Sequence, residues 1–474
     1  MDAYANVNDL DNVLSTFKRI ESLNLEPDVY TYAIILKAFV ENKRLDDAFI
    51  VFEYLKENGI ILSQPAFSTL ISGCIKANKI EKAWEIFDSM RLSYHQPDEV
   101  SFTLMLHACT KRGEVEKALN LFEDMIQQQL YPTDVTFNVL INACARRTDY
   151  FNEAFNLLDQ MKTHYGFQPD RITYNTLIMA CARNKDLPKA RELFQIMWND
   201  NEEKKTDSLL TPDSCTYTNL FWAYASCNPE LHDTQEQKPQ HYLTTLPVVQ
   251  QSILSSPPPR NQSEVVKEAH QLFNYMVASN IPVTSVLLLS YLAIHISHNQ
   301  PISSCMHIYN NLFDQYQVKK DAFTFKQMLE LCYKRKDKQL AWKIWEDYQD
   351  FLESRNKLFL VEDESISEKK AIEAEKYAMA LKEGWTDKQQ LQIAVLMTNT
   401  LARSNDLRNA ISILSSELRR SNVNPPKFNN LAPTYNKCIQ LEDEDAKNSL
   451  LKLCIKNTEK RPLSFKYKRV NTIQ

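Results

Sequence analysis

Apolar positions recur along the chain at the i, i+3, i+4, i+7 spacing of amphipathic helices, and these helices come in pairs. One pair is predicted over 65–77 and 80–92, with the turn at Asn78 and Lys79. Its apolar positions are Phe67, Leu70, Ile71, Cys74, Ala83, Ile86, Phe87 and Met90. One pair is too small to bury its own apolar face, so neighbouring pairs have to stack.

The same pattern returns about every 35 residues. An aromatic residue recurs at intervals of 35, 35, 35, 37 and 43, at Tyr32, Phe67, Phe102, Phe137, Tyr174 and Tyr217. A small residue recurs at Ala48, Ala83, Ala118, Ala154 and Ala190, and a second aromatic at Phe52, Phe87, Phe122 and Phe194. Because independent columns agree on one period, the sequence predicts an all-α fold, a right-handed superhelical solenoid of helix–turn–helix repeats.

The fit to this repeat varies along the chain and defines seven predicted segments. They are a truncated repeat at 1–28, a well-matched array at 29–227, a flexible insertion at 228–262, diverged repeats at 263–352, a linker at 353–370, a C-terminal helical region at 371–455 and a basic tail at 456–474. The insertion is polar and proline-rich, and such sequence does not pack a core.

Composition excludes several classes of protein. The chain of 474 residues contains only 5 glycines, and none forms a phosphate-binding GxGxxG or GxxxxGK[ST] loop. No apolar run reaches the length of about 18 residues that a membrane helix needs. The net charge is −5, so a nucleic-acid surface requires a local concentration of cations.

Cysteine and histidine patterns do not indicate metal binding or catalysis. The 10 cysteines include no CxxC, and five share one repeat column, at Cys74, Cys109, Cys144, Cys181 and Cys332. A cysteine at such a position behaves as a small buried hydrophobe. No HExxH and no acidic nuclease cluster is present. We therefore expect no enzymatic activity, no cofactor, no metal, no membrane partner and no small-molecule substrate.

Several strings resemble the pentatricopeptide repeat family of organellar RNA-binding proteins. They are VTFNVLINACARR at 135–147, ITYNTLIMACARN at 172–184, CTYTNLFWAYA at 215–225, and the terminators QPD at 96–98 and 168–170 and TPD at 211–213. The period fits this family better than the tetratricopeptide repeat of about 34 residues. The HxE and CxxC of the zinc deaminase domain that some members carry are absent.

The resemblance implies a set of base-reading residues. In this family one side chain directly after the repeat aromatic and a second at the end of the unit read one RNA base. The implied pairs are Ser68 with Asp98, Thr103 with Thr133, Asn138 with Asp170, Asn175 with Asp213, and Thr218 with Val283. They imply a core of G, purine, U, U and purine. A structural alternative is that these residues cap helices and build turns.

Two further columns complete the implied interface. Val100, Val135 and Ile172 would sandwich the bases, with Pro65 and Cys215 at equivalent positions, although the same column could serve inter-repeat packing. Phosphates would contact a column of cations at Lys76, Lys111, Arg146 and Arg183. These cations also complement the negative end of a helix, which is a sufficient structural reason for them.

The resemblance implies sequence-selective binding of single-stranded organellar RNA. Bound protein would support processing, stability, splicing or translation of a transcript by occupancy and by recruiting ribosomal or RNA-processing proteins. It also implies a location in mitochondria or plastids, and we favour mitochondria because the array is short and interrupted. The acidic start of the sequence does not look like a transit peptide. The alternative is a helical-repeat scaffold for protein interactions, or a mitochondrial ribosome-associated factor.

Overall fold

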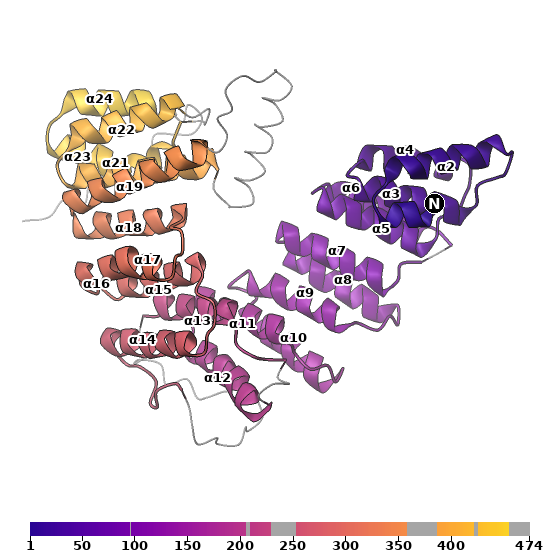
Figure 1. The fold of residues 1–474 in the computed structure, drawn as a ribbon, viewed down its shortest axis with the longest axis horizontal. Coiled ribbons are helices and arrows are strands. Elements are labelled where there is room, and N and C mark those ends of the chain that lie inside the picture. The colour runs from indigo at the N-terminus through magenta and orange to yellow at the C-terminus, as the bar shows by residue number, and fades with distance from the viewer. Residues whose placement is uncertain (95, 205–208, 229–252, 358–385, 421–424, 455–474) are drawn as a thin grey trace, which may run out of the picture. The chain divides into compact units, whose positions relative to one another are not determined.

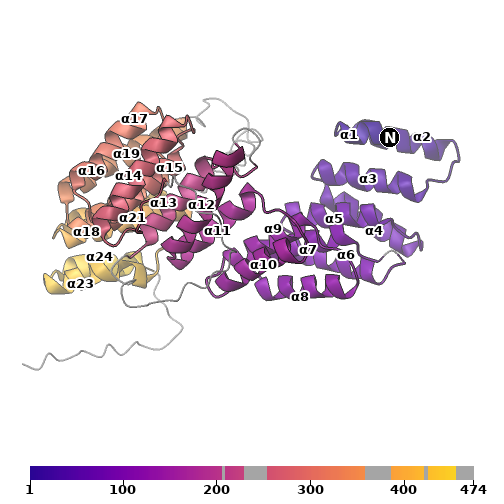
Figure 2. The ribbon, with the colours of Figure 1, turned by 90° about the horizontal axis from the view of Figure 1, so that it is seen from below.

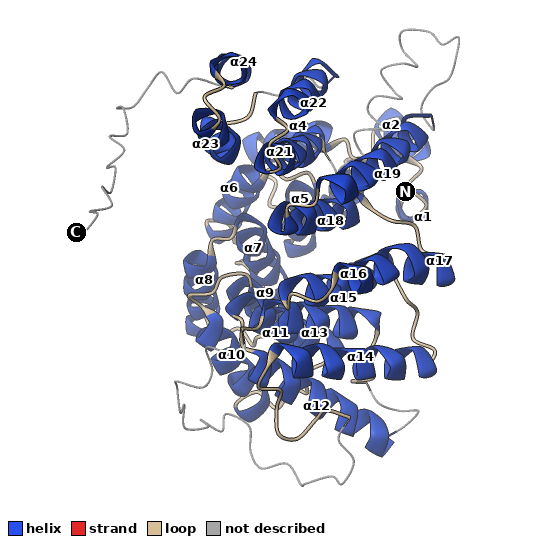
Figure 3. Ribbon diagram, turned by 90° about the vertical axis from the view of Figure 1, so that its left-hand side faces the viewer, coloured by secondary structure: helices blue, strands red, loops and turns tan. Residues whose placement is uncertain are grey.

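A computed structural model describes residues 1–94, 96–204, 209–228, 253–357, 386–420 and 425–454. Within these residues every regular element is a helix, and the helices follow one another in tandem (Figure 3). The all-α prediction is therefore confirmed. The chain divides into two compact units, Met1–Gln300 and Pro301–Gln474.

The first unit consists of helix pairs (Figure 1). Its helices are α1 (Asp2–Asn6), α2 (Leu10–Ser22), α3 (Val29–Glu41), α4 (Leu45–Glu57), α5 (Gln64–Lys76), α6 (Ile80–Arg91), α7 (Glu99–Arg112), α8 (Val115–Gln127), α9 (Asp134–Ala145), α10 (Phe151–Thr163), α11 (Arg171–Asn184), α12 (Leu187–Lys204), α13 (Ser214–Ser226), α14 (Gln262–Ala278) and α15 (Ser285–Ser297). The first helix of each pair contacts the first helix of the next, and we call α3, α5, α7, α9, α11, α13 and α15 the first-helix row (Figure 2).

Most helices of the first-helix row begin at a side-chain cap. The cap accepts a hydrogen bond from the backbone N–H three residues later, as at Asp28, Asp98, Thr133, Asp170, Asp213 and Thr284. Such a cap satisfies an otherwise unpaired N–H and stabilises a helix by about 1 kcal/mol. The caps therefore fix where each repeat begins.

The two aromatic columns of the sequence meet between repeats. On the second helices α4, α6, α8 and α12 an aromatic side chain packs, mostly edge to face, against the first-helix aromatic of the next repeat. The ring pairs are Phe52–Phe67 at 6.1 Å, Phe87–Phe102 at 5.4 Å, Phe122–Phe137 at 5.6 Å and Phe194–Tyr217 at 5.4 Å. Edge-to-face aromatic pairs at this spacing contribute beyond their buried area. They join neighbouring repeats into one core.

The cysteine column lies in that core, as predicted, with Cys74, Cys109, Cys144 and Cys181 fully buried. Burial raises the pKa of Cys109 to about 11 and that of Cys144 to about 12. These thiols are therefore neutral at physiological pH and act as small apolar groups.

A buried ionic cluster joins α12, α13 and α14. The Arg191 guanidinium lies 2.7 Å from Glu268 Oε1, and the Tyr224 hydroxyl donates to Glu268 Oε2 at 2.8 Å. Ser255 donates its N–H and hydroxyl to Glu268 Oε1 at 2.8 and 2.9 Å. The Glu268 side chain is only 2% exposed, so these partners compensate for a charge that has lost its water.

The predicted insertion over 228–262 lies mostly outside the described residues. Its end, from Ile253, packs against the array, because Leu254 is buried and Ser255 joins the cluster around Glu268. The predicted linker at 353–370 begins inside α19, and its remainder from 358 lies outside the described residues, as do 371–385 and the basic tail.

The second unit is also helical. Its elements are α16 (Ile302–His307), η2 (Ile308–Leu312), α17 (Phe313–Gln315), α18 (Ala322–Arg335), α19 (Lys338–Lys357), α21 (Asp387–Arg403), α22 (Leu407–Arg420), η3 (Phe428–Leu431), α23 (Ala432–Gln440) and α24 (Glu444–Leu453). Helix α21 contacts α18, α22 and α23, so it lies at the centre of this unit. Among the described helices of the whole chain, none combines the length and apolarity needed to cross a bilayer.

Removing the Glu268 carboxylate should destabilise the protein strongly. The Glu268→Ala variant leaves Arg191 buried and unpaired, which costs about 3–5 kcal/mol. Urea unfolding followed by circular dichroism measures the loss. The exposed neighbour Lys267 provides a matched control, and Lys267→Ala should unfold like the wild type. Equal midpoints for the two variants would show that the cluster contributes nothing.

Candidate nucleic-acid interface

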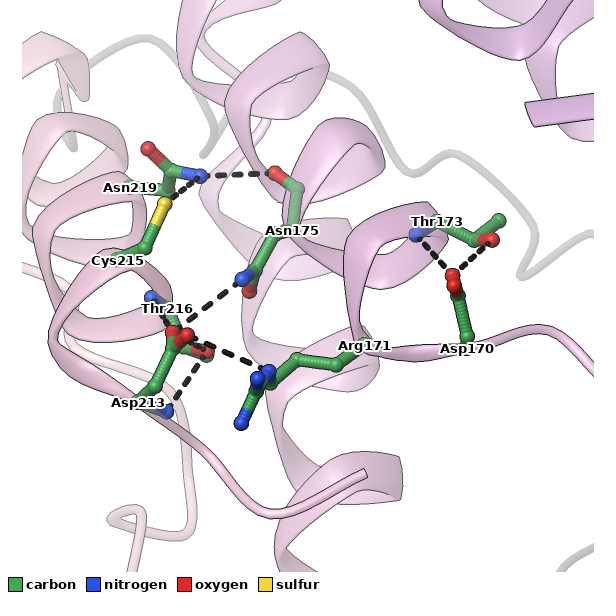
Figure 4. Close-up of polar contacts among 8 residues, drawn as sticks. All are labelled: Asp170, Arg171, Thr173, Asn175, Asp213, Cys215, Thr216 and Asn219. Carbon is green, nitrogen blue, oxygen red and sulfur yellow. Dashed lines mark hydrogen bonds and ion pairs between the residues drawn. The ribbon is translucent and has the colours of Figure 1, made fainter. Parts of the chain in front are cut away.

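Asn175 and Asp213, predicted as one reading pair, are in direct contact. Asn175 lies on α11, and its Nδ2 donates to Asp213 Oδ1 at 3.3 Å (Figure 4). Asp213 caps the next helix of the row, α13, so the contact joins two successive repeats. The Asn219 Nδ2 donates to the backbone oxygen of Asn175 at 2.9 Å and steadies it from the other side.

The Asp213 carboxylate is held in its ionised form. Partial burial alone would raise its pKa, but hydrogen bonds from Thr216 and the nearby Arg171 guanidinium hold the pKa below its ordinary value. The Arg171 Nε lies 3.3 Å from Asp213 Oδ2. An ionised carboxylate accepts hydrogen bonds only, so it fixes the direction in which the Asn175 amide points.

The second asparagine reaches its predicted partner through one intermediate. Asn138 Oδ1 contacts the hydroxyl of Thr173, and that hydroxyl lies 2.8 Å from Asp170 Oδ1. Asp170 caps α11 by accepting from the Thr173 N–H at 2.8 Å. Asn138 and Asp170 are therefore linked through the Thr173 hydroxyl and do not contact each other directly.

The threonine pair follows the same plan. Thr103 Oγ1 lies 2.9 Å from Thr136 Oγ1, which lies 3.0 Å from the hydroxyl of the cap Thr133. Thr103 also donates to the Glu99 carbonyl at 2.7 Å. In three successive repeats the predicted reader thus contacts the cap of the next helix in the first-helix row. The contact is either direct or runs through one threonine hydroxyl.

The first predicted pair is less connected. Ser68 is buried, and its Oγ has no hydrogen-bond partner among the described residues. Asp98 caps α7 through Ser101, whose hydroxyl lies 2.6 Å from Asp98 Oδ1. No hydrogen bond joins Ser68 to Asp98 in the part of the chain that the structure describes.

The partner assigned to Thr218 was wrong by one residue. Thr284, and not Val283, caps α15 and therefore corresponds to Asp213 in the preceding repeat. In most earlier units the cap directly follows a proline, as Thr133 follows Pro132, whereas Val283 separates Pro282 from Thr284, and the long insertion hides the period. Only the cap geometry sets the register.

The predicted base-sandwiching residues are exposed. Val100, Val135 and Ile172 each lie two residues after a helix cap, and 57%, 54% and 66% of their surfaces are accessible. Inter-repeat packing would bury them, so it does not explain this column. An exposed apolar side chain at the same place in successive repeats is suited to contact a ligand that runs along the row.

The predicted phosphate-contacting residues are exposed at the C-terminal ends of first helices. Lys111 Nζ donates to the Ile75 carbonyl and Arg183 donates to the Ala145 carbonyl, both at 3.0 Å. Each cation therefore covers a terminal carbonyl of the preceding first helix, as the structural interpretation expects.

The remaining two predicted phosphate contacts make no such bond between repeats. Arg146 Nε lies 3.4 Å from Asn142 Oδ1 on its own helix, and Lys76 has no ion pair or hydrogen bond among the described residues. Burial and the neighbouring Arg146 together lower the pKa of Arg183, so these two guanidinium groups lie close enough to repel each other. An anion between them would relieve that repulsion.

Sequence reasoning missed a cavity beside the last predicted reader. It has a volume of about 790 Å³ and is lined by residues of α11, α13 and the start of α15, including Thr218, Trp222 and Thr284. Trp222 lies nine residues after its cap, where earlier repeats have Ser72, His107, Asn142 and Met179. Because this column holds no common residue type, the repeat pattern does not reveal it.

The described residues contain no cluster of three or more His, Cys, Asp or Glu side chains arranged to hold a metal ion. The polar groups of this surface are instead hydrogen-bonding side chains and cations along the first-helix row. That chemistry is typical of recognition of an extended polar ligand.

Three family models match the first 201 residues of the chain. The PPR repeat family matches 62–111 and 97–146, the pentatricopeptide repeat domain matches 1–42 and 15–62, and the PPR repeat matches 135–165 and 172–201. The chain is a tandem-repeat protein of helix pairs. Its first 201 residues match pentatricopeptide repeats, and this part of the chain carries the helix caps from Asp28 to Asp170 and the predicted readers Ser68, Thr103, Asn138 and Asn175.

Solved structures with the same kind of fold show low sequence identity. The pentatricopeptide repeat protein PPR10 from maize is 16% identical, with 95% of this chain and 62% of that chain covered and a TM-score of 0.48. The PPR domain of Arabidopsis thaliana protein-only RNase P 1, in complex with tRNA, is 18% identical over 35% of this chain and 86% of that chain, with a TM-score of 0.32. The chain thus spans 62% of the length of the maize structure. A comparison with curated proteins gives no match.

Replacing Asp213 by serine should separate its role as the cap of α13 from its role in orienting Asn175. Serine caps helices about as well as aspartate, whereas alanine costs about 1 kcal/mol. Asp213→Ser should therefore unfold in urea closer to the wild type than Asp213→Ala does, while both lose the carboxylate that orients Asn175. If both variants lose the same stability, the carboxylate stabilises α13 through Arg171 and Asn175 rather than as a cap.

Proposed function

We propose that the chain binds single-stranded RNA sequence-selectively through the first-helix row from α5 to α13. It acts on a transcript by occupancy and by recruitment of processing or translation factors, without catalysis. The family resemblance supports an organellar site of action, the mitochondrion. Repeats of this family read about one base per helical repeat with two or three side chains.

The observation that carries this proposal is the Asn175–Asp213 contact beside exposed Ile172. Asp213 accepts a hydrogen bond from one N–H of the Asn175 amide. The other end of that amide, Asn175 Oδ1, is buried and has no partner among the described residues. A buried acceptor without a donor costs free energy. The N3–H of a uracil is a donor of the kind this oxygen lacks, and the second amide N–H suits a uracil carbonyl.

The neighbouring columns support the same ligand. Exposed Val135 and Ile172 are suited to cover the two faces of a base, while Arg146 and Arg183 bring positive charge to the same repeats. Apolar contact to bases combined with cations near the backbone is the general chemistry of single-strand binding. A molecule of net charge −5 achieves this only by concentrating its cations locally.

Replacing both asparagines by serine should remove the preference for uracil at two adjacent positions. We expect Asn138→Ser with Asn175→Ser to lower affinity for RNA containing the core GAUUA by up to about tenfold per position, because each change removes a hydrogen bond to a base. Binding selection from a random RNA pool and titration with the selected RNA measure both effects.

The matched control is Asn152→Ser with Asn156→Ser, which changes two exposed asparagines on the second helix α10. It should bind and select RNA like the wild type, and circular dichroism should show equal helicity in all three proteins. A wild-type selection without enrichment of a core containing two adjacent uracils would contradict the assignment of readers.

The salt dependence of binding distinguishes RNA from a protein partner. Replacing Lys76 and Arg146 by glutamine should reduce the slope of log affinity against log salt by about 0.7 for each cation that contacts a phosphate. The control replaces Lys56 and Lys267, exposed on the second helices α4 and α14. A scaffold for proteins would instead show no salt-dependent affinity for RNA.

A further inference from the structure

The cavity of about 790 Å³ lies at the position where the polar readers end. Four of its lining residues, Cys215, Thr218, Asn219 and Trp222, are spaced i, i+3, i+4 and i+7 on α13 and therefore share one face of the helix. Met179 on α11 and Val286 on α15 line it from the neighbouring repeats. Residues of the three successive first helices α11, α13 and α15 therefore line it.

In the part of the chain that the structure describes, the Trp222 ring lacks the aromatic neighbour that Trp84 and Trp198 have. The Trp84 ring packs edge to face against Phe87 at 6.1 Å, and the Trp198 ring packs against Tyr275 at 5.2 Å. Among the described residues, the Trp222 ring contacts no other aromatic ring and its N–H has no hydrogen-bond partner. An indole in that state, half-buried in a cavity, can receive an aromatic ligand.

Two polar side chains on the α13 side of the cavity, Thr218 and Asn219, offer acceptors. Thr218 already donates its hydroxyl hydrogen to the Ser214 carbonyl at 2.7 Å, so Oγ1 can only accept. Asn219 uses Nδ2 toward the Asn175 backbone oxygen, while Figure 4 shows its side-chain oxygen on the opposite side. Arg171, the cationic donor in the lining, is paired with the Asp213 carboxylate.

We propose that Trp222 is a stacking platform for an unpaired purine base, preferentially adenine, at the sixth repeat. The acceptors Thr218 Oγ1 and Asn219 Oδ1 suit the exocyclic amine of adenine, and guanine presents a carbonyl at the same place of its ring. Trp222 lies outside the columns of base readers, so it adds a determinant that the repeat pattern does not encode. This inference rests on the proposed RNA binding.

Stacking on an aromatic side chain is largely independent of base identity. Loss of one such contact reduces affinity roughly 5- to 150-fold. Trp222→Ala should therefore weaken binding of RNA with any base at this position, whereas Thr218→Val should reduce only the preference for adenine. Trp222→Phe keeps a smaller ring and should retain part of the affinity.

An abasic scan tests this without assuming where the RNA starts. A short synthetic RNA with the core GAUUA is prepared with one base removed at a time, and each version is titrated against wild type, Trp222→Ala, Trp222→Phe and Trp84→Ala. In the wild type, removing the base that stacks on Trp222 weakens binding. In Trp222→Ala that one removal has no further effect, while every other removal still does. The Trp84→Ala profile should match the wild type.

The outcomes separate the two proposals. If wild type binds the RNA but the Trp222→Ala profile is the same as the wild-type profile, RNA binding stands and Trp222 is not a platform. If one abasic penalty disappears in Trp222→Ala and returns in part in Trp222→Phe, the platform is established even where the alanine variant is less stable. If wild type binds no RNA, the proposed function fails and this inference fails with it.

Discussion

The candidate interface depends on the helix caps Thr133, Asp170 and Asp213, which begin three successive first helices. One short polar side chain starts its own helix and, from the same oxygen or through one neighbour, contacts the reader of the preceding repeat. Asp213 shows this most directly, because Oδ1 accepts from the Thr216 N–H at 2.8 Å and from Asn175 Nδ2 at 3.3 Å. Capping and base reading are therefore not alternatives in this protein. The same geometry that begins a helix positions the group that would read a base.

The cation column would combine a structural role with the proposed phosphate-binding role in the same way. Lys111 and Arg183 cover helix carbonyls of the preceding repeat, and their side chains remain exposed at that end of the row. A side chain with several N–H donors can hold a carbonyl and still offer donors to an anion. The structural explanation for these residues thus leaves the phosphate-binding explanation open, whereas Lys76 has no structural contact, among the residues described, that would account for it.

Much of the fold could be predicted from the sequence, because the residues that recur with the repeat are the buried ones. The period of the aromatic and alanine columns predicts the helix pairs, and the helix expected at 80–92 is observed as Ile80–Arg91. Prediction from the sequence failed where a residue does not follow the repeat pattern. Thr284 stands one residue further from its proline than most earlier caps do, so the register follows from the hydrogen bond that its hydroxyl accepts from the Leu287 N–H. Trp222 has no counterpart of its residue type in the other repeats of the first unit, so comparison of repeats does not detect it.

The cluster around Glu268 has a consequence for how this protein tolerates change. Hydrogen bonds in this cluster hold Ser255 against α12 and α14. Helix α13 ends at Ser226. Both ends of the segment between these two residues are therefore held in place by the array. For a loop whose ends are fixed, doubling its length costs only about 0.6 kcal/mol. Additional residues between these anchors would therefore leave the alignment of α13 with α15 intact. The array can acquire a new peptide module here, by evolution or by design, without losing continuity along its first helices.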